Sequence, residues 1–83
     1  MSNKDDKITY EIVEQIAELS TSGSWALELN KVSWNGREPK LDIRSWDEMH
    51  EKCSKGITLT EEEAYKLMEA LQDYFAATEV NEE

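Results

Sequence analysis

The stretch KVSWNGREPKLDIRSWDEMHEKCSKGITLT, residues 31–60, decides the fold of this chain. It contains segments in which apolar and polar residues alternate, a turn signal between them, and a helix cap at its end. It also holds six of the nine cationic side chains and two of the three tryptophans. Strand, turn and cap signals in this order predict paired strands followed by a helix.

Residues 40–46 show the period-two alternation of a strand with one buried face. Leu41 and Ile43 are predicted to face the core, and the opposite face is predicted to carry Lys40, Asp42, Arg44 and Trp46. Before this strand, Asn35-Gly36 is a hairpin signal and Pro39 stops ladder pairing. The sequence therefore predicts a hairpin whose second strand has a functional outer face.

Two further strands flank this region. Residues 25–29 alternate in one phase and residues 32–34 in the opposite phase, which predicts one long strand with a β-bulge near Asn30–Lys31. A turn is predicted at residues 20–24, and a short strand at residues 55–59. The segment before residue 20 has spacings that fit either a helix or a strand, so periodicity alone leaves its type open.

The last element is a helix. Thr60 and Glu63 form a capping box, and the glutamates of the first turn complement the helix dipole. Apolar residues then recur at three- and four-residue spacing, at Ala64, Leu67, Met68, Leu71 and Phe75. This pattern predicts a helix from about Glu61 to Ala77.

Length and composition predict one small domain at residues 7–77, with disordered, solvated tails at residues 1–6 and 78–83. A chain of 83 residues buries only about 60–65% of its surface, so an apolar helix stripe over a small sheet favours a homodimer. The sequence shows neither a membrane-span pattern nor a signal-peptide pattern, and Cys53 has no second cysteine to pair with. These features predict a cytoplasmic, reduced protein.

The charge is unevenly distributed. The net charge is −10, and residues 1–30, 31–56 and 57–83 carry −4, +1 and −7 respectively. Cations interleaved with tryptophans are typical of surfaces that bind single-stranded nucleic acid, because they supply charge for phosphates and flat faces for bases. The predicted site residues are Lys31, Trp34, Asn35, Arg37, Lys40, Arg44, Trp46, Lys52 and Lys55.

Some of these residues have a second interpretation. Trp34 shares its phase with Val32, so a core position stays open for it. Arg44 and Asp42 lie two residues apart on one face, which also fits a structural salt bridge. For the whole chain, the alternative is an acidic protein-interaction module that does not bind nucleic acid.

Catalysis and metal binding are not predicted. His50 and Cys53 are too few for a closed zinc site, and as a dyad they lack an orienting third group. We expect both in a loop. No enzyme activity, cofactor, metal or small-molecule substrate is expected.

Three ordered motifs resemble the transcriptional coactivator positive-cofactor-four family, and most closely its small bacterial YdbC-type members. They are LNKVSWN at residues 29–35, EPKLDIRSW at residues 38–46 and KGITLTEEE at residues 55–63. The resemblance implies an α+β fold: a curved four-stranded antiparallel sheet followed by one C-terminal helix, assembled as a homodimer through the helix and sheet edges. It also implies that the first segment is a strand, from about Ile8 to Leu19.

The resemblance further implies sequence-non-specific binding of single-stranded DNA across the sheet, without catalysis, in transcription, replication or repair. RNA as a ligand and association with the nucleoid stay open. Eukaryotic members carry more cations in the strand that matches residues 25–34, where this chain has Glu28 and Asn30. This departure predicts weaker phosphate contact here.

Overall fold

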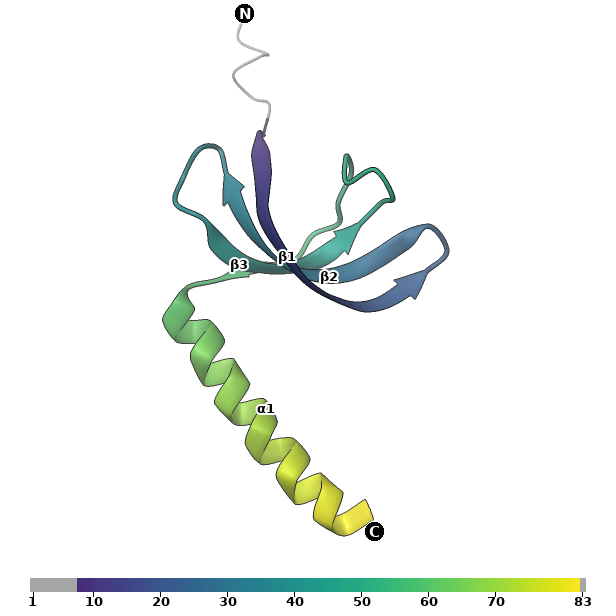
Figure 1. Ribbon diagram of the computed structural model, residues 1–83, viewed down its shortest axis with the longest axis vertical. Helices are drawn as coiled ribbons and strands as arrows, with labels where there is room; N and C mark the ends of the chain where they lie inside the picture. The colour runs from purple at the N-terminus through teal and green to yellow at the C-terminus, as the bar shows by residue number, and fades with distance from the viewer. Residues whose placement is uncertain (1–7, 83) are drawn as a thin grey trace, which may run out of the picture.

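The computed structural model describes residues 8–82, which form one antiparallel sheet and one C-terminal helix (Figure 1). The strands lie in the sheet in chain order, and each is antiparallel to its neighbour. The elements are β1 at Tyr10–Ser22, β2 at Trp25–Trp34, β3 at Lys40–Trp46, β4 at Ile57–Leu59 and α1 at Glu61–Glu82. The predicted α+β class is confirmed, and the first segment is a strand.

Short turns connect the first three strands. Asn35 and Gly36 have φ values of 54° and 74°, and the N–H of Arg37 donates to the carbonyl of Trp34 at 2.9 Å. Two central residues with positive φ define the tight hairpin turn that Asn-Gly favours, so this prediction is confirmed. The β1–β2 turn is shorter than predicted, because β1 continues to Ser22.

The predicted bulge near Asn30–Lys31 is wrong. β2 pairs with β3 without interruption, from Ala26 opposite Trp46 to Val32 opposite Lys40. The change of phase in β2 has another cause: Val32 is fully buried on one face, while Leu29 faces the helix side. Both faces of this strand are therefore partly covered.

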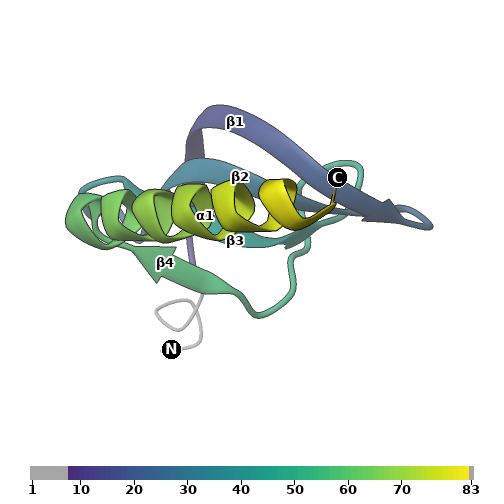
Figure 2. The same cartoon turned by 90° about the horizontal axis from the view of Figure 1, so that it is seen from below.

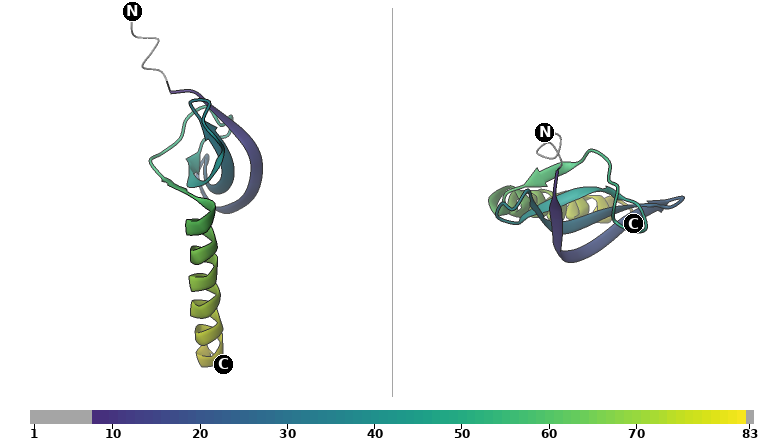
Figure 3. Two further views of the ribbon diagram at one scale, coloured as in Figure 1. Left: turned by 90° about the vertical axis from the view of Figure 1, so that its left-hand side faces the viewer. Right: turned by 90° about the horizontal axis from the view of Figure 1, so that it is seen from above.

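Irregular pairing occurs instead in β1. Its register against β2 shifts between Ile12 and Glu14, between Gln15 and Ala17, and between Glu18 and Ser20. Each bulge increases the local twist and bends the strand. Figure 3 shows the resulting curl of the sheet, with β1 on the outside of the curve. The curl gives the sheet a concave face and a convex face.

The small core of the described chain lies on the concave face. Its buried side chains are Val32, Trp46, Asn30 and Asp42, each at most 1% exposed. The convex face carries Leu41 and Ile43, which are only partly buried and border the helix. Their separation from Asp42 and Trp46 is confirmed, but the prediction that their face is the buried one is wrong for this chain. Half of the buried set is polar, so hydrogen bonds must hold this core together.

The helix begins with the predicted capping box. The N–H of Glu63 donates to Thr60 Oγ1 at 3.0 Å, and the N–H of Thr60 donates to Glu63 Oε1 at 2.9 Å. α1 continues to Glu82, beyond the predicted end at Ala77, because residues 78–82 contain neither Gly nor Pro to stop it. Residues 1–6, which were predicted to form a tail, lie outside the described residues, and so does residue 83.

α1 projects away from the sheet and meets it only near its first turns, beside β3 and β4 (Figures 1 and 2). Its apolar stripe is consequently exposed: Leu67, Met68, Leu71 and Phe75 are 39–54% accessible. Among the described residues, no helix is both long enough and apolar enough to span a membrane.

Candidate nucleic-acid interface

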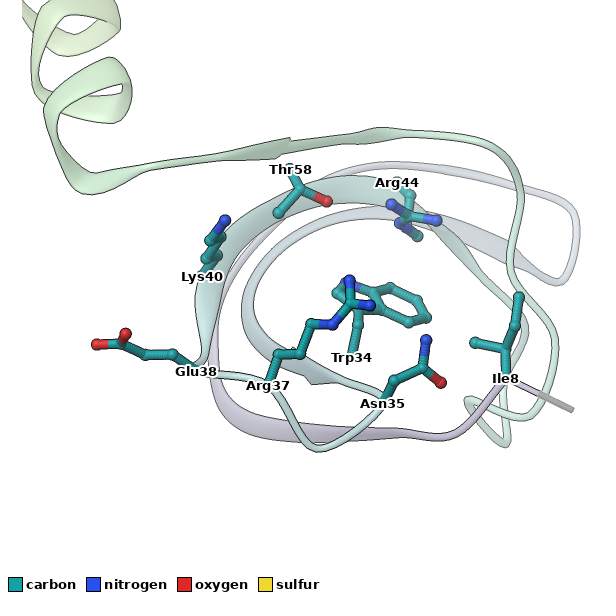
Figure 4. A pocket seen from close by; sticks show the side chains of 8 residues that line it. All are labelled: Ile8, Trp34, Asn35, Arg37, Glu38, Lys40, Arg44 and Thr58. Carbon is teal, nitrogen blue, oxygen red and sulfur yellow. The ribbon is translucent and has the colours of Figure 1, made fainter. Parts of the chain in front are cut away.

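The concave face holds an open cavity of about 640 Å³ at the end of the β2–β3 hairpin (Figure 4). Five of the predicted site residues meet here, and they come from β2, the turn and β3. Arg37 and Trp34 point into the space enclosed by the curled sheet, while Glu38 points away from it. The lining residues are Ile8, Trp34, Asn35, Arg37, Glu38, Lys40, Arg44 and Thr58.

An aromatic cluster forms the floor of this face. The rings of Trp34 and Trp46 are nearly parallel, at 14°, with centroids 6.2 Å apart. Tyr10 packs against both rings, at 5.7 Å and 5.1 Å. Trp34 keeps part of its surface accessible at the cavity, so it is the tryptophan that can meet a ligand.

The prediction that Trp46 offers an open face for a base is wrong. Trp46 lies on the predicted side of β3 but is only 1% exposed. Tyr10, Trp34 and His50 pack around its ring. In this structure the buried ring of Trp46 stacks against the ring of Trp34 and supports it.

Asp42 is the polar centre of the face. It is fully buried, and its carboxylate accepts hydrogen bonds from three side chains. Arg44 donates to it through Nε at 2.7 Å and Nη2 at 2.8 Å. The indole Nε1 of Trp34 donates at 3.3 Å and the hydroxyl of Thr58 at 3.0 Å. A buried carboxylate with this many donors and a cation is well compensated.

The alternative interpretation of Arg44 as a salt-bridge residue is confirmed. Its guanidinium binds Asp42 in bidentate fashion and lies 4.6 Å from the centre of the Trp34 ring. Burial alone would lower the pKa of Arg44, but the hydrogen bonds and charge of Asp42 outweigh it and raise that pKa. Arg44 is therefore a fixed, permanent cation.

Arg37 and Lys40 differ from Arg44 because their side chains are exposed. Among the described residues, neither of them forms an ion pair. The backbone of Arg37 is fixed: its N–H donates to the carbonyl of Trp34 and its carbonyl accepts from Ser33 Oγ at 2.6 Å. Both cations are thus positioned beside Trp34 with their charged ends free to contact phosphates.

The remaining predicted residues lie in three different places. Asn35 borders the cavity, but its Oδ1 accepts the N–H of Thr9 at 3.0 Å, which ties the turn to the start of β1. Lys31 has the opposite strand parity from Trp34 and pairs with Leu41, so it lies on the convex side. Lys52 and Lys55 belong to the loop between β3 and β4 and do not line the cavity.

That loop, residues 47–56, closes one end of the concave face. As expected it contains His50 and Cys53, and the exposed thiol of Cys53 is free. His50 Nε2 lies 3.0 Å from the Glu28 carboxylate, and the hydroxyl of Tyr10 donates to the carbonyl of His50. Among the described residues no cluster suited to a metal ion is present.

The carboxylate of Asp47 organises the loop internally. It accepts the backbone N–H groups of Glu51 at 2.8 Å and Lys52 at 3.1 Å. The hydrogen bond from Lys52 is the main cause that lowers the pKa of Asp47, and the one from Glu51 adds to it.

The loop ends at Gly56, which passes so close to Ile43 that any side chain there would collide with β3.

Two residues that hold the Trp34–Asp42 arrangement in place were missed from the sequence. Tyr10 joins the aromatic cluster because antiparallel pairing sets it opposite Trp34. That position could have been found only by pairing the first strand with the second. Thr58 binds Asp42 across the β3–β4 ladder, and it gives no signal beyond its place in a short strand.

An antiparallel sheet with an aromatic and cationic concave face, followed by one helix, is an architecture suited to binding nucleic acid. The family model of the transcriptional coactivator p15 (PC4) matches residues 21–70. An uncharacterised protein of Treponema pallidum (strain Nichols) is 46% identical over 68 residues, which cover 81% of this chain and 80% of that protein. The chain belongs to the transcriptional coactivator p15 (PC4) family, and this membership supports a general nucleic-acid-binding role.

Proposed function

We propose that the protein binds single-stranded DNA, without preference for base sequence, on the concave face of its sheet. One observation carries the proposal: exposed Arg37 and Lys40 border the same cavity as the partly exposed ring of Trp34. Cations beside an accessible aromatic ring match the alternation of phosphates and unstacked bases along a single strand. A duplex hides its base faces and is therefore a poorer ligand for this arrangement.

The overall charge of −10 limits the strength of such binding. Acidic side chains elsewhere repel the strand, so the attraction is local to the cavity. Two exposed cations give a shallow salt dependence, with a log–log slope of roughly −1.4 from their contacts alone. Any contacts from Lys52 or Lys55 would make the slope steeper.

Fluorescence anisotropy with labelled oligo-dT tests the proposal directly. We expect saturable binding of oligo-dT, clearly weaker binding of a duplex of equal length, and weaker binding at the higher of two salt concentrations. Equal affinity for the duplex would contradict the stacking argument. An absence of any binding would favour the acidic protein-interaction alternative. An oligo-U arm measures whether RNA is also a ligand.

We further propose a non-enzymatic role in transcription, replication or repair, in the cytoplasm and close to the nucleoid. The support is the family membership, together with a site whose residues bind and position but form no nucleophile or acid–base set. The motifs at residues 29–35 and 38–46 support placement among the small bacterial members of the family.

We propose that the protein acts as a homodimer. An apolar groove of about 540 Å³ lies between α1 and the convex face, lined by residues such as Leu29, Ile43, Leu67, Leu71 and Phe75. An isolated chain would leave this surface in water, which is unfavourable for so many large apolar side chains. A second copy offers the same apolar stripe and suits a self-complementary contact.

A further inference from the structure

Arg44 lies over the Trp34 ring, yet most of its hydrogen-bonding capacity is already used within the protein. Its Nε and Nη2 donate to Asp42, and its Nη1 donates to the carbonyl of Ser54 at 3.3 Å. Three of the five N–H donors of a guanidinium are thus occupied. The side chain is only 15% exposed. Few N–H donors and little exposed surface of Arg44 therefore remain for contact with a phosphate.

Asp42 connects this cation to the tryptophan. The same carboxylate holds the Arg44 guanidinium, the Trp34 indole N–H and the Thr58 hydroxyl. Because Asp42 is fully buried and bound from three directions, the indole cannot rotate without breaking a hydrogen bond to a charged group. The ring is therefore held in one orientation before any ligand arrives.

We propose that Asp42, Arg44 and Thr58 form a positioning set that fixes the Trp34 ring for base stacking, and that Arg44 is a positioning residue rather than a phosphate ligand. The inference rests on the proposed function, in which Arg37 and Lys40 contact phosphates. Fixing a side chain in advance removes the ordering cost that binding would otherwise carry. The sequence alone grouped Arg44 with the phosphate-binding cations.

Arg44→Lys separates the two roles of Arg44. Lysine keeps the charge but cannot form the bidentate fork with Asp42 or lie flat on the ring. A positioning role predicts that Arg44→Lys weakens oligo-dT binding about fivefold or more, a sizeable part of one stacked base. The control is Lys31→Arg, which exchanges one cation for another on the convex side of the sheet, outside the cavity, and should change affinity less than about twofold.

Thr58→Val gives a second test that alters no charge. It removes one donor to Asp42 at nearly constant volume, so the fold should survive even if Arg44→Lys is poorly folded. We expect weaker oligo-dT binding with an unchanged salt slope, and a shifted, broadened indole N–H resonance of Trp34 in the ligand-free protein. Arg37→Ala should instead lower the slope by about 0.7 and leave that resonance in place.

The outcomes distinguish the inference from the proposed function. If the wild-type protein binds oligo-dT and both Arg44→Lys and Thr58→Val bind equally well, the positioning role is wrong and the function stands. A reduced salt slope for Thr58→Val would also overturn it, since that would mean lost phosphate contacts. If the wild-type protein does not bind oligo-dT, both proposals fail together.

Discussion

Glu28 and His50 are 22 residues apart in the chain, yet His50 Nε2 lies 3.0 Å from the Glu28 carboxylate, and this contact fastens the loop at residues 47–56 to β2. The His50 ring also packs against Trp46, at a centroid distance of 5.7 Å. The pair therefore holds in place part of the cover that buries Trp46. The stability of the loop and the packing of Trp46 against Trp34 therefore both depend on the contact between Glu28 and His50.

Glu28→Gln should loosen this loop. It replaces the carboxylate that contacts His50 Nε2 with a neutral amide, and we expect a loss of about 1 kcal/mol in the free energy of unfolding, because both side chains are partly exposed. Urea unfolding followed by tryptophan fluorescence measures the effect. Glu48→Gln is the control, since Glu48 makes no ion pair among the described residues. Equal stability of the two variants would show that the pair contributes nothing.

Trp34→Ala and Trp46→Ala should have different effects. Trp34 is partly exposed, so its loss should weaken oligo-dT binding about tenfold or more while the protein stays folded. Trp46 is buried, so its loss should cost about 3–5 kcal/mol of stability. Thermal unfolding and anisotropy on both variants check this. A stable Trp46→Ala protein with normal packing would contradict the assignment of Trp46 as support.

The double variant Arg37→Glu, Lys40→Glu should flatten the salt dependence of binding. If each cation contacts one phosphate, the log–log slope decreases by about 1.4 and affinity falls steeply. Lys31→Glu is the control on the convex side and should leave the slope almost unchanged. Oligo-dT titrations at four salt concentrations give the slopes. An unchanged slope for the double variant would move the phosphate contacts away from this cavity.

Acid should release the loop at residues 47–56. The backbone hydrogen bonds from Lys52 and Glu51 lower the pKa of Asp47, so the folded loop takes up a proton less readily than the unfolded chain does. Their stabilising effect is complete above the ordinary pKa of about 4 and is lost as the pH falls through the lower folded value. The amide resonances of Glu51 and Lys52 should report this transition, and Asp47→Asn should abolish it. A transition that persists in Asp47→Asn would assign it to another group.

Leu71→Glu should dissociate the proposed dimer. Leu71 is 46% exposed and lines the apolar groove beside α1, where a buried charge is costly. Sedimentation equilibrium should show a dimer for the wild-type protein and a monomer for this variant. Lys66→Glu places the same residue on the opposite side of the helix and should leave the dimer intact. A monomeric wild-type protein at tens of micromolar would contradict the proposal.

Local signals predicted the parts of the fold that depend on neighbouring residues. The capping box at Thr60, the turn at Asn35 and the alternation of Leu41 with Ile43 all involve contacts within a few residues or one strand period. The alternation also set Trp46 on the correct face. It could not show that Tyr10 and His50 cover that ring, because Tyr10 is 36 positions away in another strand and His50 lies in a loop, to which strand alternation does not apply.

The candidate site was predicted in part for the same reason. Trp34, Arg37 and Lys40 were found because they cluster in one stretch of sequence. Because β2 has no bulge against β3, its side chains alternate strictly between the two faces, and Lys31 therefore lies on the face opposite Trp34. The binding of Thr58 to Asp42 depends on the register of β4, which a three-residue strand does not specify by itself.

The three bulges of β1 also affect how this protein meets other proteins. β1 is an outer strand of the sheet, and its Val13, Ile16 and Leu19 are 43–52% exposed. A flat outer strand with such residues would be a template for cross-β aggregation. The bulges break its row of free N–H and C=O groups into short segments, so a foreign strand cannot add in continuous register. The irregularities that curve the sheet thus also hinder the addition of a foreign strand at this edge.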